Sequence, residues 1–141
     1  MNKSLTDFLF EKDEKDLKEL VERYDIPPPK KDVKKVLINK IASYMRTPKF
    51  HEKVKTELVH DMLIVIDLLI SNKNKIKREE LQNQFLARKE VKESFNPLII
   101  RMQHLGLIYK DHKRNGQENG QMIFLPKEFA FWLEEYVESN L

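Results

Sequence analysis

The first third of the chain carries apolar residues at helical spacing, separated by polar breaks. A short apolar segment over residues 5–10 precedes a predicted helix over residues 14–24, which Asp13 can cap. Three consecutive prolines end this helix, and another is expected over residues 33–45, with Asp32 as its cap. The apolar stripe predicted to face inward from residues 33–45 consists of Val33, Val36, Leu37, Ile41 and Tyr44.

A longer apolar repeat fills the middle of the chain. Thr47-Pro48 is expected to open a helix that runs through about Ser71, and a shorter helix follows over residues 78–86. A further helix is predicted around residues 91–105, where Gly106 provides the C-terminal cap. The residues expected to face the core from this segment are Leu98, Met102 and Leu105.

After Gly106 the apolar period changes from helical to alternating. Branched and aromatic residues at 107–109 and 122–125 predict two strands, joined by a polar stretch with two Asn-Gly turns. Pro126 then starts a last helix with an aromatic-rich stripe. That stripe consists of Phe129, Trp132, Leu133, Tyr136 and Val137. The pattern therefore predicts a mainly α fold with a small β-hairpin near the C-terminus.

Composition excludes several classes of protein. The chain of 141 residues has no cysteine, which excludes a disulfide framework, a thiolate nucleophile and a cysteine-based zinc site. The longest apolar run, residues 62–70, contains Asp67 and is far shorter than the roughly 20 residues that span a bilayer. The N-terminal segment turns acidic where a signal peptide would be apolar. We therefore expect a cytoplasmic protein with no membrane partner.

Charge is concentrated in one segment. The formal net charge is only +3, but residues 26–60 carry nine basic and three acidic side chains. Residues 1–25 carry five basic and eight acidic side chains, and residues 61–141 are neutral in sum. An anionic partner is therefore expected to meet the segment over residues 26–60 first.

Residues 60–125 resemble the winged-helix superfamily. The most specific part is RMQHLGLIYKD, residues 101–111, followed after a polar insertion by GQMIFLPKE, residues 120–128. In that superfamily a leucine-glycine corner, here Leu105-Gly106, ends the third helix, and a basic hairpin then forms the wing. The resemblance implies that the third helix enters the major groove of DNA and that the wing contacts the backbone.

Residues 16–45 resemble the SAP-type helix-extended-loop-helix motif. The matching positions are Leu17, Leu20 and Ile26 in the first half, and Lys34, Leu37, Ile38, Lys40 and Ile41 in the second. The glycine of the family's loop is absent, and three prolines stand in its place. Both resemblances imply nucleic-acid binding. Together they predict an N-terminal helical hairpin over residues 1–46, followed over residues 47–141 by a winged helix-turn-helix with a C-terminal helix.

Two groups of polar residues are candidates for contact with DNA. Clustered cations neutralise phosphates and release counterions, and the N-terminal group consists of Lys30, Lys31, Lys34, Lys35, Asn39 and Arg46. In the third helix, amide and guanidinium side chains are suited to base edges. The second group consists of Asn96, Arg101, Gln103 and His104, with Lys110, Lys113 and Arg114 in the wing. Duplex DNA is favoured over single-stranded DNA as the partner.

An interaction module is the alternative function. Ile100 lies in the middle of the outward face of the third helix, where an apolar residue reads no base edge. That face could instead dock a partner protein or a second subunit. Trp132 and Tyr136 in the last helix are further candidates for such an interface, although an aromatic stripe at helical spacing is more often core.

The sequence carries no persuasive catalytic motif. The four histidines are scattered, and His51-Glu52-Lys53-Val54-Lys55 has a lysine where a zinc-protease helix has its second histidine. No phosphate-binding glycine loop or nucleophile elbow is present. We therefore expect no enzyme activity, cofactor or metal. The expected function is that of a DNA-binding transcription regulator, or of an accessory factor of replication or of a mobile element.

Overall fold

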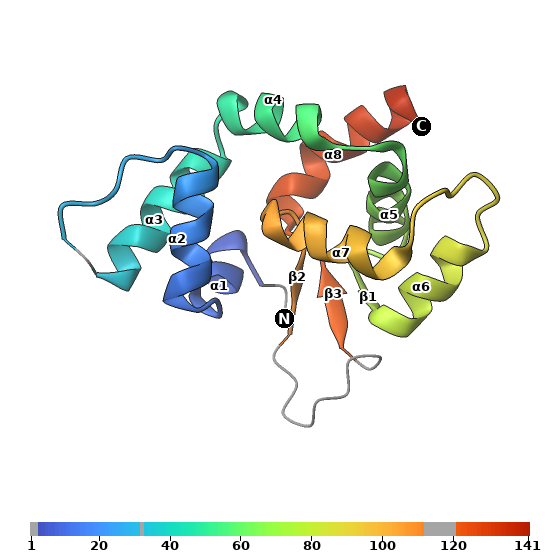
Figure 1. Cartoon of the computed structure of the whole chain (residues 1–141), viewed down its shortest axis with the longest axis horizontal. Helices are drawn as coiled ribbons and strands as arrows, with labels where there is room; N and C mark the ends of the chain where they lie inside the picture. Colours follow the sequence, from blue (N-terminus) through green and yellow to red (C-terminus); the bar gives the residue numbers. More distant parts are fainter. Residues whose placement is uncertain (1–2, 32, 112–120) are drawn as a thin grey trace. The chain divides into compact units, whose positions relative to one another are not determined.

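The computed structural model describes residues 3–31, 33–111 and 121–141. Within these residues the chain forms eight helices and three short strands, which confirms the mainly α fold with a small β element (Figure 1). The chain divides into two compact units, Met1–Glu57 and Leu58–Leu141. The predicted boundary between the two modules lies after residue 46, whereas in the structure residues 47–57 group with the N-terminal unit.

Four helices make up the N-terminal unit. They are α1 (Leu5–Phe10), α2 (Glu14–Arg23), α3 (Lys34–Met45) and α4 (Pro48–Glu57). The Ser4 hydroxyl accepts a hydrogen bond from the Asp7 backbone N–H, and the Asp7 carboxylate accepts one from the Ser4 backbone N–H, so a capping box starts α1. Both α1 and α2 pack against α3. The helix α3 is therefore the central element of this unit.

The buried face of α3 differs from the predicted one. The buried residues are Leu37, Ile38, Ile41, Ala42 and Met45. By contrast Val33 and Val36 are exposed, so the prediction was wrong for these two, whereas Tyr44 is half-buried with its ring near those of Tyr24 and Phe50. The helices α1, α2 and α4 all pack on α3, and its buried face includes Ala42 in place of the two valines. The proposed cap, Asp32, lies outside the described residues.

An aromatic cluster joins α2, α3 and α4. The ring centroids of Tyr24 and Phe50 lie 5.1 Å apart, and that of Tyr44 lies 5.6 Å from Tyr24 and 5.9 Å from Phe50. Such tilted and edge-on pairs stabilise a core beyond the burial of their area. Burial raises the pKa of both tyrosine hydroxyls above the ordinary value. The cluster therefore fixes where the extended segment after α2 leaves the helix.

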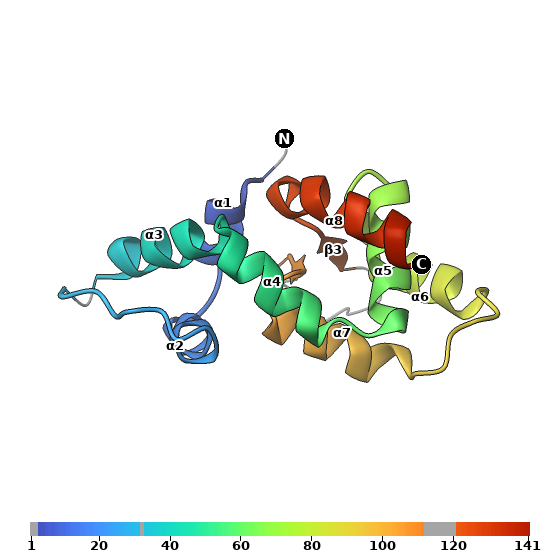
Figure 2. The same ribbon diagram turned by 90° about the horizontal axis from the view of Figure 1, so that it is seen from above.

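The C-terminal unit is built around one apolar helix and a three-stranded antiparallel sheet. The elements are α5 (His60–Ser71), β1 (Lys75–Lys77), α6 (Arg78–Leu86), α7 (Phe95–His104), β2 (Tyr109–Lys110), β3 (Met122–Phe124) and α8 (Lys127–Asn140). The strands lie in the order β1-β3-β2, with Ile76 opposite Ile123 and Tyr109 opposite Phe124. Figures 1 and 2 show α8 lying beside α5, against which it packs. No helix among the described residues is long and apolar enough to cross a bilayer.

The single long helix predicted from Thr47 to Ser71 is wrong, because the chain breaks between α4 and α5. Val59 adopts an extended backbone, with φ −95° and ψ 163°, and its carbonyl accepts the first hydrogen bonds of α5, from Met62 and Leu63. Neither glycine nor proline marks the break. The two helices therefore share one continuous apolar pattern in the sequence although each belongs to a different unit.

Two corners position the sheet. Gly106 follows the end of α7 and has φ 78°, in the left-handed region. This agrees with its predicted role in ending the helix. The other corner uses Lys73 and Asn74, with φ 63° and 70°, and turns the chain from α5 into β1. The Asn74 N–H donates to the Leu69 carbonyl, and the Asn74 carbonyl accepts from Leu125 N–H beyond the end of β3. This second corner contains no glycine, and neither it nor β1 was predicted.

Candidate nucleic-acid interface

The predicted basic cluster lies around the start and along the outer side of α3. All six of its residues are exposed: Lys30, Lys31, Lys34, Lys35, Asn39 and Arg46. The first two lie in the segment that leads from the triple proline into α3, and the others follow along the helix. The first turn of α3 contains no acidic residue, so the positive end of the helix dipole adds to the field of the lysines.

One member of the cluster is tied to its own unit. The Lys34 ammonium donates to the Phe10 carbonyl at the end of α1, at 2.9 Å. It thereby satisfies a backbone acceptor that has no partner within α1, as cations near a helix C-terminus commonly do. Lys34 therefore connects α1 to α3, and its ammonium group already interacts with a carbonyl of its own unit.

The other cations of the cluster have no such partner. Among the described residues, no carboxylate and no carbonyl pairs with Lys30, Lys31, Lys35 or Arg46. Cations without a protein partner attract solvent counterions, and binding a polyanion releases these ions.

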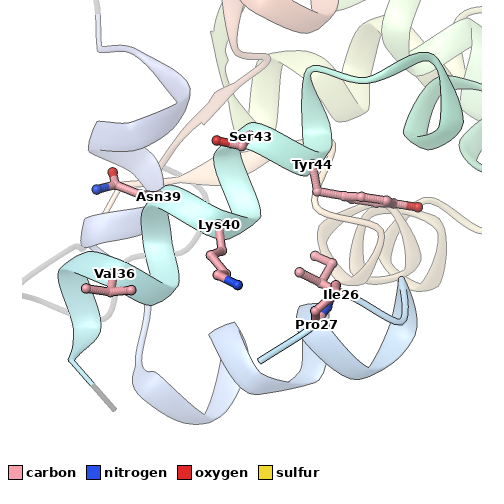
Figure 3. Close-up of a pocket in the computed structure, with 7 residues that line it drawn as sticks. All are labelled: Ile26, Pro27, Val36, Asn39, Lys40, Ser43 and Tyr44. Carbon is pink, nitrogen blue, oxygen red and sulfur yellow. The ribbon is translucent and has the colours of Figure 1, made fainter. Parts of the chain in front are cut away.

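A pocket of about 490 Å³ opens beside this cluster (Figure 3). One wall is the extended segment at Ile26 and Pro27, and the other is the outer face of α3. The residues contributed by α3 are Val36, Asn39, Lys40, Ser43 and Tyr44. In Figure 3 the Lys40 side chain extends from α3 toward the wall formed by Ile26 and Pro27. The pocket thus combines apolar walls with one cation, an amide and a hydroxyl.

The third helix of the predicted winged helix is α7. Its buried side contains Leu98 and Met102, and Leu105 directly after the helix is buried as well, so the predicted inward residues are confirmed. Exposed positions of the opposite side are Asn96, Ile100, Arg101 and His104. Gln103 is half-buried, and its side-chain nitrogen is covered and makes no hydrogen bond among the described residues.

Two of the polar residues on α7 are held by neighbouring side chains. The Arg78 guanidinium donates to the Asn96 side-chain oxygen at 2.9 Å and lies 5.7 Å from the centre of the Phe95 ring. The Arg101 guanidinium donates to the Glu93 carboxylate, also at 2.9 Å. Before either residue could contact a base, it would have to exchange this partner for the DNA.

The wing is described only at its base. Lys110, at the end of β2, is exposed, and the next residue, Asp111, accepts a hydrogen bond at 3.0 Å from the Met122 N–H at the start of β3. The remaining cations proposed for the wing, Lys113 and Arg114, lie outside the described residues. Their contribution to an interface therefore stays a prediction.

A second set of cations was missed in the sequence. Lys75 and Lys77 are exposed on β1, an edge strand of the sheet, and Arg78 starts α6 directly after them. The alternating Lys-Ile-Lys pattern could have indicated a strand with both lysines on its exposed face, since Ile76 is buried between them. Charged residues on an edge strand also prevent pairing with other strands, so their presence does not by itself indicate DNA.

A buried carboxylate fixes the connection between α6 and α7. Asp61 is only 2% exposed and accepts hydrogen bonds from the backbone N–H groups of Lys92 and Glu93, at 2.7 and 2.6 Å. Burial by itself would raise the pKa of Asp61, but these two donors, with His60, hold it below its ordinary value. Because Glu93 also pairs with Arg101, Asp61 helps to position the polar side of α7.

The apolar candidates for an interface differ in exposure. Ile100 is 48% exposed on α7, as the interaction hypothesis requires, whereas Trp132 and Tyr136 on α8 are half-buried. Among the described residues the most exposed large apolar side chain is that of Phe131, at 87%, and Phe131 was not among the predicted interface residues. It falls outside the helical stripe of the last helix, and this was the signal that it faces solvent.

The described residues contain no group of three or more histidine, aspartate or glutamate side chains that could hold a metal ion. Comparisons of the chain with protein-family models, with curated proteins and with solved structures gave no match.

Proposed function

We propose that the chain is a non-enzymatic DNA-binding protein whose N-terminal unit binds backbone phosphates. The observation that carries the proposal is the set of exposed cations around α3 that have no partner among the described residues: Lys30, Lys31, Lys35 and Arg46. Four unpaired cations on one loop and one helix side match the requirement for phosphate neutralisation.

The C-terminal unit supports a second contact with DNA in this proposal. The order helix, strand, helix, helix, strand, strand over α5–β3, with β3 between the other strands, supports the winged-helix interpretation. In that interpretation α7 approaches the major groove with Asn96, Arg101 and His104, and the wing contacts the backbone. The proposed role is that of a cytoplasmic transcription regulator, or of an accessory factor of replication or of a mobile element.

The test is a titration of duplex DNA at several salt concentrations, with a triple charge reversal in the cluster. We expect Lys31→Glu, Lys35→Glu and Arg46→Glu together to lower affinity by more than about a hundredfold at low salt, since three phosphate contacts become repulsive. The matched control is Lys15→Glu, Lys89→Glu and Lys127→Glu, which makes the same change in net charge at exposed positions outside residues 26–60. Equal losses in both variants, or an affinity independent of salt, would contradict the proposal.

A protein-docking role for α7 is the second candidate function. Ile100 is exposed in the middle of the face whose polar residues Asn96 and Arg101 are already paired. Ile100→Glu separates the two roles. If DNA affinity stays within about twofold while capture of a partner or self-association is lost, the docking role of α7 holds.

A further inference from the structure

The pocket beside α3 is suited to an apolar side chain that is accompanied by negative charge. Its apolar lining comes from Ile26, Pro27, Val36 and Tyr44, and its volume of about 490 Å³ exceeds what one aromatic ring needs. Lys40 extends into it, and neither Lys40 nor Asn39 has a side-chain partner among the described residues. A ligand that is apolar at its tip and acidic around it would therefore pair both kinds of surface.

The same chain carries such a group on α8. Phe131 is 87% exposed, and the next exposed residues along the helix are Glu134, Glu135 and Glu138. Positions three, four and seven residues after Phe131 lie on its side of a helix. We call these four residues the acidic ridge. None of its glutamates pairs with a cation among the described residues.

We propose that the acidic ridge of one copy of this chain docks into the α3 pocket of a second copy. Phe131 would enter between Pro27 and α3, and the glutamates would lie against Lys40. A helix that places one apolar anchor in a groove is a recurring mode of recognition. The charge complementarity of the two surfaces argues for this occupant, because Lys40 in the pocket has no partner among the described residues and the ridge presents three glutamates without one.

Each copy has one ridge and one pocket, so the contact can form in two ways. Two copies can exchange ridges in a closed two-fold dimer, or each ridge can dock into the next copy and produce rings or open chains. In either form the assembly is expected to be favoured by a higher concentration and to weaken as salt increases.

The test is sedimentation velocity of the full chain from micromolar to near-millimolar concentration. The wild type should associate, and Lys40→Glu or Phe131→Ser should each weaken association by at least about tenfold, because one charge is reversed or the anchor is lost. Glu134→Lys is a second ridge variant. Matched controls are Lys53→Glu and Leu86→Ser, which alter an exposed lysine and an exposed apolar residue elsewhere and should leave association unchanged.

Mixing two defective variants makes the decisive measurement. Lys40→Glu keeps an intact ridge and Phe131→Ser keeps an intact pocket, so their equimolar mixture should form a one-to-one complex that grows no further. A wild type that remains monomeric at every concentration overturns the proposal, whether the ridge binds within its own chain or binds another protein. Association that survives in both variants overturns it too. The proposal does not rest on DNA binding, which the duplex titration tests separately.

Discussion

In the N-terminal unit α3 buries five of its twelve residues, whereas in the C-terminal unit α5 buries eight of its twelve. Both helices are central to their units, yet they differ in how much of their surface remains exposed for binding. Neighbours cover α5 on nearly every side, so it contributes stability and no binding face. One whole side of α3 stays in solvent, with polar and cationic residues along it. The comparison teaches that the central helix of a small unit can act as core and as binding surface together.

The arginines of the C-terminal unit differ from the basic cluster of the N-terminal unit in a related way. Each described arginine of the C-terminal unit has an intramolecular partner: Arg78 bonds to Asn96, Arg88 pairs with Asp67 and Glu90, and Arg101 pairs with Glu93. In the basic cluster Lys34 alone is engaged with a described residue. Exposed lysines of the C-terminal unit, such as Lys75 and Lys77, also have no partner among the described residues, but residues 61–141 are neutral in sum whereas residues 26–60 carry nine basic and three acidic side chains. Electrostatic attraction of DNA is therefore expected to depend on the basic segment of the N-terminal unit.

The largest effect should come from breaking one core while leaving the other intact. Phe85 is fully buried in the C-terminal unit, with its ring 5.5 Å from that of Phe95. Phe85→Ala should lower the free energy of unfolding of this unit by about 3–5 kcal/mol, because it removes buried area and leaves a cavity. Denaturation followed by the fluorescence of Trp132, the single tryptophan, reports on this unit.

The matched core variant is Phe50→Ala, which removes a fully buried ring from the N-terminal unit. It should leave the Trp132 transition in place and shift a separate transition seen by circular dichroism. A Trp132 transition that shifts equally in both variants would mean that the two units unfold as one.

The next effect concerns the buried carboxylate of the C-terminal unit. Asp61→Asn should cost about 1–3 kcal/mol near neutral pH, because an uncharged amide replaces a carboxylate that accepts two backbone hydrogen bonds. The folded-state pKa of Asp61 lies below the ordinary value, so its stabilisation is present above that ordinary pKa and is lost as pH falls through the folded pKa. The difference between wild type and variant should therefore shrink in acid.

Urea titrations of both proteins at a series of pH values measure this difference. Asp67→Asn is the control, because Asp67 is half-buried on the same helix and pairs with Arg88 at 3.4 Å. It should change stability by less than about 1 kcal/mol. A pH-independent difference between wild type and Asp61→Asn would contradict the assignment.

A smaller change in stability is expected from substitutions at one left-handed residue in each unit. Gly106, with φ 78°, ends α7, whereas Asp25, with φ 54°, turns the chain after α2. Gly106→Ala should cost about 1–2 kcal/mol, because a side chain is unfavourable in the left-handed region. Asp25→Gly should be close to neutral, since relief of the same strain is offset by the greater freedom of glycine in the unfolded chain. Thermal unfolding of the two variants measures both values.

The smallest effects are expected at two adjacent lysines, where one substitution should change stability and the other DNA affinity. Lys34→Ala should lower the stability of the N-terminal unit by about 0.5 kcal/mol, since the Phe10 carbonyl loses its donor. Lys35→Ala should leave stability unchanged and reduce the dependence of log affinity for DNA on log salt by about 1, because one phosphate contact is lost. The reverse pattern would mean that the engaged lysine, and not the free one, meets the DNA.

Helices with a clear apolar period were predictable from the sequence, and features set by neighbours were not. The inward residues Leu98 and Met102 were predicted because α7 has a single covered side. The covered side of α3 was partly misplaced because packing of α1, α2 and α4, which its own apolar pattern does not specify, covers Ala42 and leaves Val36 exposed. The strand β1 was missed because three residues carry too little pattern, and only pairing with β3 makes them a strand.

In the candidate site, too, local properties could be predicted from the sequence and tertiary contacts could not. Exposure of the basic cluster could be predicted, because charged residues on a short loop and helix rarely find enough partners to be buried. The engagement of Lys34 and the pairing of Asn96 with Arg78 could not, since each joins residues far apart in the sequence. The pocket beside α3 also depends on tertiary structure, because its two walls meet only when the chain folds back after α2.

The three prolines before α3 have a consequence for the thermodynamics of any binding event at this pocket. Proline has few backbone conformations even in an unfolded chain, so Pro27, Pro28 and Pro29 lose little entropy when they order. They also offer no N–H group with which another strand could pair. Pro27 belongs to the pocket wall and Pro28 and Pro29 follow it, so this wall has little backbone freedom to lose. Binding there should therefore proceed with a small entropic penalty.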